Sequence, residues 1–262
     1  MENRDVEKFA KKCRFDILDM TFKKKAGFIG SDYSCIDILS CLYLNHFNYD
    51  TDDFVMSKGH AAAAWYTVLA NLGKIEHEKL NDFNTSGKNL GVHPKRGSIP
   101  DIKTSTGSLG QGFGLASGMA LAERIKKGNG RVYALLGDGE ANEGSVWEIV
   151  MFAAKHQLDN FIMVLDRNHL QSYGFDKDVL DVGDFKSKLC AFGWDVISID
   201  GHNINQINTA FNFAKKQDSK PHAIIAETVK GKGVSEMENE VIWHYKWPDD
   251  ELYRKAMQEL GL

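Results

Sequence analysis

Two short polar motifs in the second half of the chain could bind a metal ion together with a phosphate. Gly137-Asp138-Gly139 follows an apolar run, and Asn168 follows the next apolar run, 168 − 138 = 30 residues further on. A carboxylate and an amide oxygen are hard ligands, which suit Mg²⁺ or Ca²⁺ and not zinc. Flanking glycines let the backbone approach a phosphate closely, and a helix expected from about Ser145 would add N–H donors. The alternative is a tight turn with a surface asparagine.

Eight of the nine histidines, all except His244, fall into three groups by their surroundings. His60 and His93 lie at a helix start or in a loop beside other motif residues, where a side chain that titrates near neutral pH could transfer protons. His202 is expected to stabilise the turn before a helix over residues 204–217. Ordinary packing or surface roles are expected for His46, His77, His156, His169 and His222.

The elements that must position these residues alternate along the second half of the chain. Strands are predicted over 131–136, 161–166, 194–200 and 222–229. The intervening helices are predicted over about 145–156 and 204–217. Alternation of this kind predicts an α/β fold, with a parallel sheet and helices on both faces. Ligands bind at the carboxyl ends of such strands, so Asp138 and Asn168 should face one crevice.

The first half of the chain is predicted to be mainly helical. Helices are expected over the first ~20 residues, from about Ser34, and from near His60 to Gly73. Residues 81–108 are expected to form a long ordered loop. A final amphipathic helix is predicted over 249–260. The sequence contains no internal repeat and no linker, so a single domain over 1–262 is expected.

Three glycines recur at regular intervals in the segment after residue 107. Gly110, Gly114 and Gly118 are four residues apart and would share one helix face. Because each glycine destabilises a helix by roughly 1 kcal/mol, the face indicates very close packing against a ligand or another helix. A transmembrane G-x-x-x-G face is the alternative, and the polar Gln111 and Ser117 argue against it.

Composition excludes several classes of protein. The 262 residues are 43% apolar and 26% charged, with a net charge of −4, which is ordinary for a folded soluble domain. No apolar run reaches the ~18 residues of a membrane span, and the start is too charged for a secretory signal. Nucleic acid is not expected as a partner, because it requires a basic face. The four cysteines lack disulfide or metal spacing, so a cytoplasmic location is expected.

Several motifs together resemble the thiamine-diphosphate-binding half of transketolase, and more closely the separate N-terminal subunit of split transketolases. These motifs are DDFVMSKGHAAAAWYTVLANLG at 52–73, His93-Pro94, STGSLGQGFGLASGMALAER at 105–124, the GDG…N pair, DGHN at 200–203 and VKGKGVSEMEN at 229–239. They occur in the family's order over nearly the whole chain. The resemblance therefore implies the thiamine-diphosphate-binding fold.

The resemblance also implies roles for individual residues. Mg²⁺, for which Ca²⁺ or Mn²⁺ can substitute, would be held by Asp138, Asn168 and the carbonyl of Leu170. Catalytic roles are implied for His60, His93, His244 and Glu143, the last of these near an interface between two cofactor sites. Contacts to thiamine diphosphate are implied for His60, Gly107, Leu109, Gly137, Asp138, Gly139 (through its N–H), Glu143, Asn168 and His244.

The implied activity is transfer of a two-carbon ketol unit from a ketose to an aldehyde, with a pocket histidine accepting a proton. The family also needs a pyrimidine-binding domain, which this chain does not contain in sequence. A separate C-terminal transketolase subunit is therefore expected as partner, in an α2β2 assembly. Two alternatives stay open: the α subunit of another thiamine diphosphate enzyme acting on 2-oxo acids, and a non-catalytic binding or scaffold protein.

The sequence departs from the family pattern at three positions. Phe28 stands where the family has a histidine, Tyr245 where a glycine follows His244, and Glu236 where an aromatic residue is usual. Phe28 and Tyr245 would touch the donor pocket. They predict a preference for a specialised sugar over the ordinary sugar-phosphate donors.

Overall fold

The predicted parallel sheet is present in the computed structural model, which describes residues 3–261. The strands are β1 (Asp53–Met56), β2 (Val132–Gly137), β3 (Phe161–Arg167), β4 (Asp195–Asp200) and β5 (His222–Glu227). They pair in the order β1-β2-β3-β5-β4, and every pairing is parallel. The strands after residue 130 fall where the alternating pattern predicts them.

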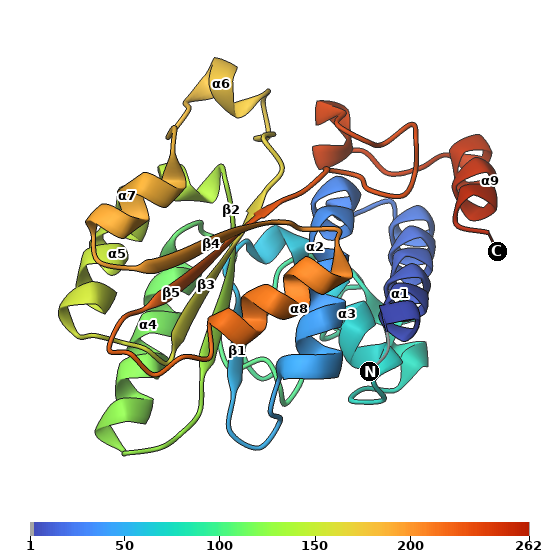
Figure 1. Cartoon of the computed structure of the whole chain (residues 1–262). Helices are drawn as coiled ribbons and strands as arrows, with labels where there is room; N and C mark the ends of the chain where they lie inside the picture. The colour runs from blue at the N-terminus through green and yellow to red at the C-terminus, as the bar shows by residue number, and fades with distance from the viewer. Residues whose placement is uncertain (1–2, 262) are drawn as a thin grey trace.

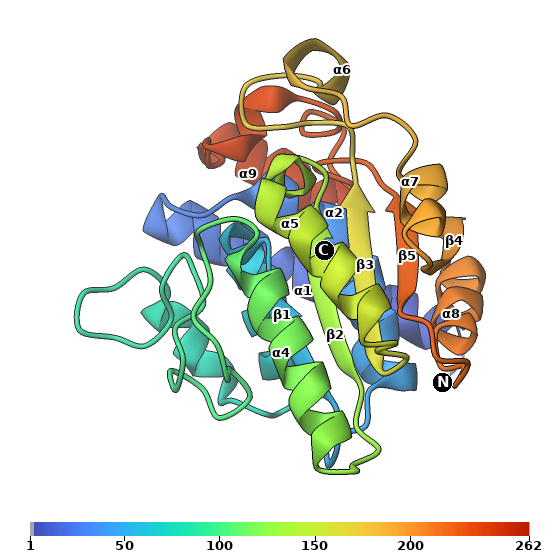
Figure 2. The same ribbon diagram turned by 90° about the vertical axis from the view of Figure 1, so that its left-hand side faces the viewer.

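Helices cover both faces of this sheet (Figure 1). They are α1 (Asn3–Lys24), α2 (Ile29–Cys41), α3 (Ala62–Asn71), α4 (Gln111–Ile125), α5 (Gly144–Lys155), α6 (Asp176–Val179), α7 (Phe185–Ala191), α8 (Ile204–Phe213) and α9 (Asp250–Glu259). Figure 2 shows α4 and α5 side by side in front of β2 and β3. Among the described residues, no helix combines the length and apolar character that crossing a bilayer requires.

Two hydrophobic cores lie on opposite faces of the sheet, and each strand contributes alternate residues to them. On β2, Tyr133 and Leu135 pack into the core formed with α1, α2, α3 and α8. Val132, Ala134 and Leu136 pack into the other core, with α4, α5 and α7. This alternation is the two-residue period of a strand whose faces are both buried. It confirms the predicted α/β fold with helices on both faces.

Three details differ from the sequence-based expectations. Strand β1 was not predicted, because four residues within a longer motif give too short a signal. Helix α2 begins at Ile29, before the expected Ser34, because the carbonyl of Phe28 accepts hydrogen bonds from the next turn. The turn before α8 is held by the side chains of Asp200 and Asn203, not by the ring of His202.

The glycine face of α4 packs closely over only part of its length. A Cβ on Gly110 would collide with the Ser145 hydroxyl, and one on Gly114 would touch Ile149 at 3.7 Å. Gly118 has open space around it, so the expectation of close packing is wrong there. Close approach within the helix also occurs at Gly112, where a Cβ would lie 2.8 Å from the Cα of Ser57. This contact draws α4 against the end of β1.

Candidate functional site

A cavity of about 490 Å³ opens where β2 and β3 end. Segments from both halves of the chain meet around it, including the turns after β1, β2, β3 and β5. The residues predicted from sequence to form the site all line it: Phe28, His60, His93, Gly107, Leu109, Gly137, Asp138, Gly139, Glu143, Asn168, Leu170, His244 and Tyr245. Residues separated by more than two hundred positions are therefore gathered at one edge of the sheet.

Backbone N–H groups fix the acidic end of the cavity. Asp138 follows β2 directly and is 5% exposed. Its Oδ1 accepts from the N–H of Gly139 at 2.9 Å, and its Oδ2 accepts from the N–H of His169 at 2.6 Å. Asn168 follows β3, and its Oδ1 accepts from the N–H of Leu170 at 3.1 Å. Burial, with a contribution from Asp166, raises the pKa of Asp138 to about 6. The Gly139 N–H that the resemblance assigns to a diphosphate is thus used by Asp138 here.

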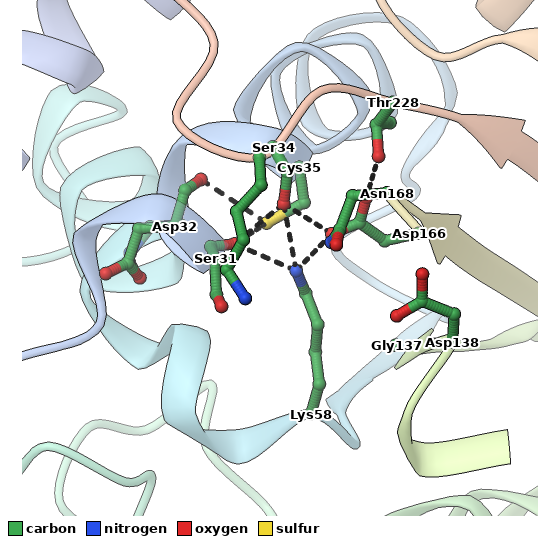
Figure 3. A network of polar contacts seen from close by, with 12 residues as sticks. Ser31, Asp32, Ser34, Cys35, Lys58, Gly137, Asp138, Asp166, Asn168 and Thr228 are labelled. Carbon is green, nitrogen blue, oxygen red and sulfur yellow. Dashed lines mark hydrogen bonds and ion pairs between the residues drawn. The ribbon is translucent and has the colours of Figure 1, made fainter. Parts of the chain in front are cut away.

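A buried ion pair lies beneath these two residues. Figure 3 shows Lys58 extended toward Ser31, Ser34 and Asp166, with Asp138 and Asn168 beside them. The ammonium of Lys58 pairs with Asp166 and donates to the carbonyl of Ser31 at 2.8 Å. Burial alone would lower the pKa of Lys58, but the adjacent Asp166 outweighs it and raises that pKa. The pair therefore stays ionised.

Further hydrogen bonds complete the surroundings of Asp166. Ser34 donates to its Oδ2 at 2.5 Å, and Thr228 donates to its Oδ1. Because Asp166 pairs with Gly137 in the sheet register, this network connects α2, β2, β3 and the end of β5 directly below the cavity. Neither Lys58 nor Asp166 was predicted from sequence. Lys58 stands within the SKGH motif, but nothing local in the sequence pairs it with Asp166, 108 positions away.

A second lysine reaches the cavity from the other side. Lys230 is 1% exposed, and its Nζ lies 3.0 Å from Nδ1 of His244 and 3.5 Å from the carbonyl oxygen of Leu170. Burial lowers its pKa to about 8, and Asp138 acts in the opposite direction. Lys230 was not predicted from sequence. Its place in the VKGKG motif, among glycines that allow close backbone approach, was the available signal.

Glu140 joins two of the glycine turns that line the cavity. Its Oε1 accepts from the Ser57 hydroxyl at 2.5 Å and from the N–H of Gly110 at 2.8 Å, and its Oε2 accepts from the N–H of Gly137 at 3.4 Å. Burial raises the pKa of Glu140 to about 7. Gly110 adopts a left-handed conformation with φ +79°, which favours glycine. Glu143, by contrast, is exposed at the start of α5.

Aromatic rings form the other end of the cavity, with Phe28 at their centre. Its ring centroid lies 5.4 Å from that of His60, 5.8 Å from His93, 5.4 Å from His244 and 5.8 Å from Tyr245. Burial lowers the pKa of each of the three histidines, for His244 to about 3 with a further contribution from Lys230. The three imidazoles are therefore neutral at pH 7. His60 and His93 can each offer one acceptor nitrogen to a substrate, whereas Nδ1 of His244 already accepts from the ammonium of Lys230.

Comparison with known proteins assigns the chain to a family. Residues 6–261 match the family described as transketolase, thiamine diphosphate binding domain. The chain is 36% identical to one of the subunits of the apulose-4-phosphate transketolase of Phocaeicola vulgatus, covering 100% of this chain and 95% of that protein. It is also 36% identical to the 6-deoxy-6-sulfo-D-fructose transketolase subunit SqwG of a Clostridium species, covering 98% and 96%.

The solved structures agree with this assignment. Transketolase from Campylobacter jejuni superimposes with a TM-score of 0.93 at 31% identity, over 100% of this chain and 43% of the longer one. The chain thus spans about two fifths of that transketolase, but nearly all of the short relatives that are named as subunits. The predicted resemblance to the N-terminal subunit of split transketolases is confirmed. This chain belongs to the transketolase family, as its thiamine-diphosphate-binding domain.

Proposed function

We propose that this chain is the cofactor-binding subunit of a two-chain transketolase-type enzyme. The enzyme transfers a two-carbon ketol unit from a ketose to an aldehyde. The observation that carries this proposal is the convergence of Asp138, Asn168 and three neutral histidines on one cavity. A scaffold protein would have no need of this combination of buried carboxylate, lysine and imidazole groups around an open cavity. The membership of the chain in the transketolase family supports the same reaction type.

Mg²⁺ is proposed to bind at Asp138, Asn168 and the carbonyl of Leu170, with Ca²⁺ or Mn²⁺ as substitutes. The donor set fits, because all three groups offer oxygen. The Asp138 carboxylate is buried and its pKa is raised, so a cation beside it would favour its ionised form.

Thiamine diphosphate, when bound, supplies the nucleophilic carbon and the electron sink for cleaving the carbon–carbon bond. Residues of this chain would hold its diphosphate. Gly107, Leu109 and Gly139 line the cavity with closely approaching backbone, and Lys230 provides positive charge. At the other end, a neutral imidazole accepts the proton of the donor hydroxyl next to the bond that breaks. His60 and His93 are proposed for this step, and His244 is proposed to bind donor oxygens.

The second chain is proposed to be a C-terminal transketolase subunit that brings the pyrimidine-binding domain, in an α2β2 assembly. Exposed apolar side chains border the cavity and would be covered by it: Tyr173 is 85% exposed and Val179 44%. Glu143, exposed beside the same cavity, is proposed to lie at this interface. The two short relatives, each named as a subunit, support a separate partner.

We also propose a single domain over 1–262 and a cytoplasmic location, in keeping with four free cysteines.

A specialised ketose is proposed as the donor, because Phe28 occupies the centre of the histidine group. A benzyl ring cannot donate or accept a hydrogen bond, so a donor hydroxyl facing it would lose a partner. Tyr245, 55% exposed, narrows the cavity mouth beside it. We therefore expect a deoxy or branched ketose to be preferred over xylulose 5-phosphate. The relatives named for apulose 4-phosphate and for 6-deoxy-6-sulfo-D-fructose support a donor outside the ordinary set.

The test is to reconstitute this chain with its partner chain and to assay ketoses and 2-oxo acids side by side, with thiamine diphosphate and Mg²⁺. We expect ketose-dependent transfer to an aldehyde and no turnover of 2-oxo acids. Turnover of 2-oxo acids alone would favour the 2-oxo acid dehydrogenase alternative, and no turnover of either would favour a non-catalytic protein. The isolated chain, free of partner by mass spectrometry, should have no activity. Full activity without a partner would contradict the two-chain proposal.

A further inference from the structure

The DGHN motif at 200–203 places a histidine ring between two distant parts of the chain. His202 follows β4, and its side chain is 13% exposed. Its Nδ1 lies 2.8 Å from Oδ2 of Asp37 on α2. Its Nε2 accepts from the backbone N–H of Val229, just after β5, at 2.8 Å. The ring therefore connects α2 to the segment that leads into the cavity.

The hydrogen bonds fix the tautomer of this ring. A backbone N–H can only donate, so Nε2 of His202 must present its lone pair to Val229. The proton of the neutral ring is then on Nδ1, from which it is donated to the carboxylate of Asp37. Each ring nitrogen thus has one defined partner. The contact with Asp37 requires a hydrogen-bond donor at residue 202, and the contact with Val229 requires an acceptor.

Asp37 also binds Arg14, which hydrogen-bonds the segment after β5 three residues beyond Val229. The guanidinium donates to Oδ1 and Oδ2 of Asp37 at 2.9 and 2.7 Å. Its remaining Nε–H donates to the carbonyl of Lys232 at 3.0 Å. Burial alone would raise the pKa of Asp37, but Arg14 and His202 lower it below its usual range. One ionised carboxylate therefore organises two side chains that hold the segment 229–232 at both ends.

Lys230 lies between these two contacts. Its Nζ enters the cavity near His244 and Leu170. The segment has little freedom to move, because Gly231 donates to the carbonyl of Gly30 at 3.0 Å, and a Cβ on Gly30 would lie 3.1 Å from the Lys230 side chain. The position of the ammonium is thus set by the contacts at residues 229 and 232 together with the one at Gly231.

We propose that Arg14, Asp37 and His202 form a positioning triad, which sets Lys230 at the diphosphate end of the cavity and so determines affinity for thiamine diphosphate. The triad touches neither cofactor nor substrate, and it acts through the segment 229–232. The inference rests on the proposed function, because it assigns Lys230 to the cofactor. It predicts that the bond from Val229 to His202, and not merely the presence of a polar residue at 202, governs cofactor binding.

Two substitutions of His202 separate its two contacts. In His202→Gln the amide oxygen reaches the place of Nε2 and can still accept from Val229. In His202→Asn the shorter amide keeps the donor to Asp37 but does not reach Val229. The measurement is calorimetric titration of the reconstituted assembly with thiamine diphosphate at fixed Mg²⁺. We expect His202→Asn to bind about tenfold more weakly, as for one lost hydrogen bond, and His202→Gln to stay within about threefold of wild type.

Controls make the result specific. His46→Gln changes another partly buried histidine, whose ring bonds Asn208 away from the cavity, and should leave affinity unchanged. If His202→Asn does not assemble with the partner chain, Arg14→Lys provides the test. This variant keeps a positive charge beside Asp37 but loses the hydrogen bond to Lys232, and it should also bind thiamine diphosphate more weakly. Wild-type affinity in His202→Asn or in Arg14→Lys, or equal losses in the Asn and Gln variants, would overturn the triad. Wild-type protein that binds no thiamine diphosphate would contradict the proposed function itself.

Discussion

The two ends of the cavity are held in place by different forces. At the acidic end, backbone N–H groups and the buried Lys58–Asp166 pair fix Asp138 and Asn168. At the aromatic end, no side-chain hydrogen bond among residues 3–261 holds the rings of His60 or His93, and ring packing around Phe28 sets their positions. Hydrogen bonds weaken steeply when their distance or angle departs from the optimum, whereas aromatic pairs are favourable over centroid separations of about 4.5–7 Å. The acidic end is therefore the more rigid of the two, and the aromatic end is the one where a few side-chain changes can alter the shape of the cavity.

Removal of the Asp138 carboxylate should have the largest effect on cofactor binding, because it removes a proposed metal ligand from the acidic end. We expect Asp138→Ala to abolish Mg²⁺-dependent binding of thiamine diphosphate, since the diphosphate charge would lose a compensating metal in a partly desolvated site, at a cost of several kcal/mol. Calorimetry with the complete assembly measures this. Asp178→Ala, which removes an exposed carboxylate on α6, is the matched control. Unchanged affinity in Asp138→Ala would rule out the metal assignment.

Breaking the buried ion pair should come next, and it tests whether the rigid end depends on it. Lys58→Met leaves Asp166 charged and unpaired in the interior, which typically costs about 3–5 kcal/mol. We expect that loss in urea unfolding, and a smaller loss in Lys58→Met/Asp166→Asn, where both charges are gone. Lys23→Met breaks the exposed pair with Asp19 and should cost less than about 1 kcal/mol. Equal effects of Lys58→Met and Lys23→Met would show that burial gives the pair no special weight.

A substitution at Phe28 tests whether the aromatic end of the cavity determines the choice of donor. Phe28→His restores a hydrogen-bonding ring among the three histidines, and a donor hydroxyl would regain a partner worth roughly 1–3 kcal/mol. We expect kcat/KM for xylulose 5-phosphate to rise by about tenfold or more in the reconstituted enzyme, with thiamine diphosphate affinity unchanged. If the wild type already uses that donor at rates typical of transketolases, and histidine adds nothing, the specialised-donor proposal fails.

The last expected effect is a pH dependence at Asp32, a fully buried carboxyl group on α2. Burial raises its pKa to about 7, and Oδ2 has no hydrogen-bond partner among the described residues. The folded state therefore holds a proton that the unfolded chain releases near pH 4, so stability is present at low pH and is lost as pH rises toward 7. Relative to wild type, Asp32→Asn should gain roughly 2 kcal/mol in unfolding free energy as the pH rises from 5 to 7, measured by urea unfolding. Parallel pH profiles would contradict this.

The residues at the acidic end of the cavity were easier to predict from the sequence than the contacts at the aromatic end. Asp138 and Asn168 could be predicted to meet because two apolar runs identify neighbouring strands, and parallel strands end at the same edge of a sheet. The pairing of Lys58 with Asp166 could not, because β1 is only four residues long and the partners are far apart in sequence. The environment of His202 was mistaken for a local turn, because its partners come from α2 and from the end of β5.

Phe28 lies between these cases. Its substitution for a polar residue is visible in the sequence, but its contact with four rings depends on α2, the turn after β1, the long loop and the segment after β5 meeting in space. Side-chain packing of that kind has no sequence period. A short-range pattern can therefore indicate that a pocket has changed, but not which groups the new side chain touches.

The buried pair beneath Asp138 and Asn168 bears on the order in which the enzyme is put together. Lys58 and Asp166 neutralise each other within the chain, so neither of these two buried charges needs a metal or cofactor to compensate it. The acidic end then exists before the cofactor arrives, and the cofactor meets a surface that needs little reorganisation. Association of the two chains would then not have to wait for the cofactor.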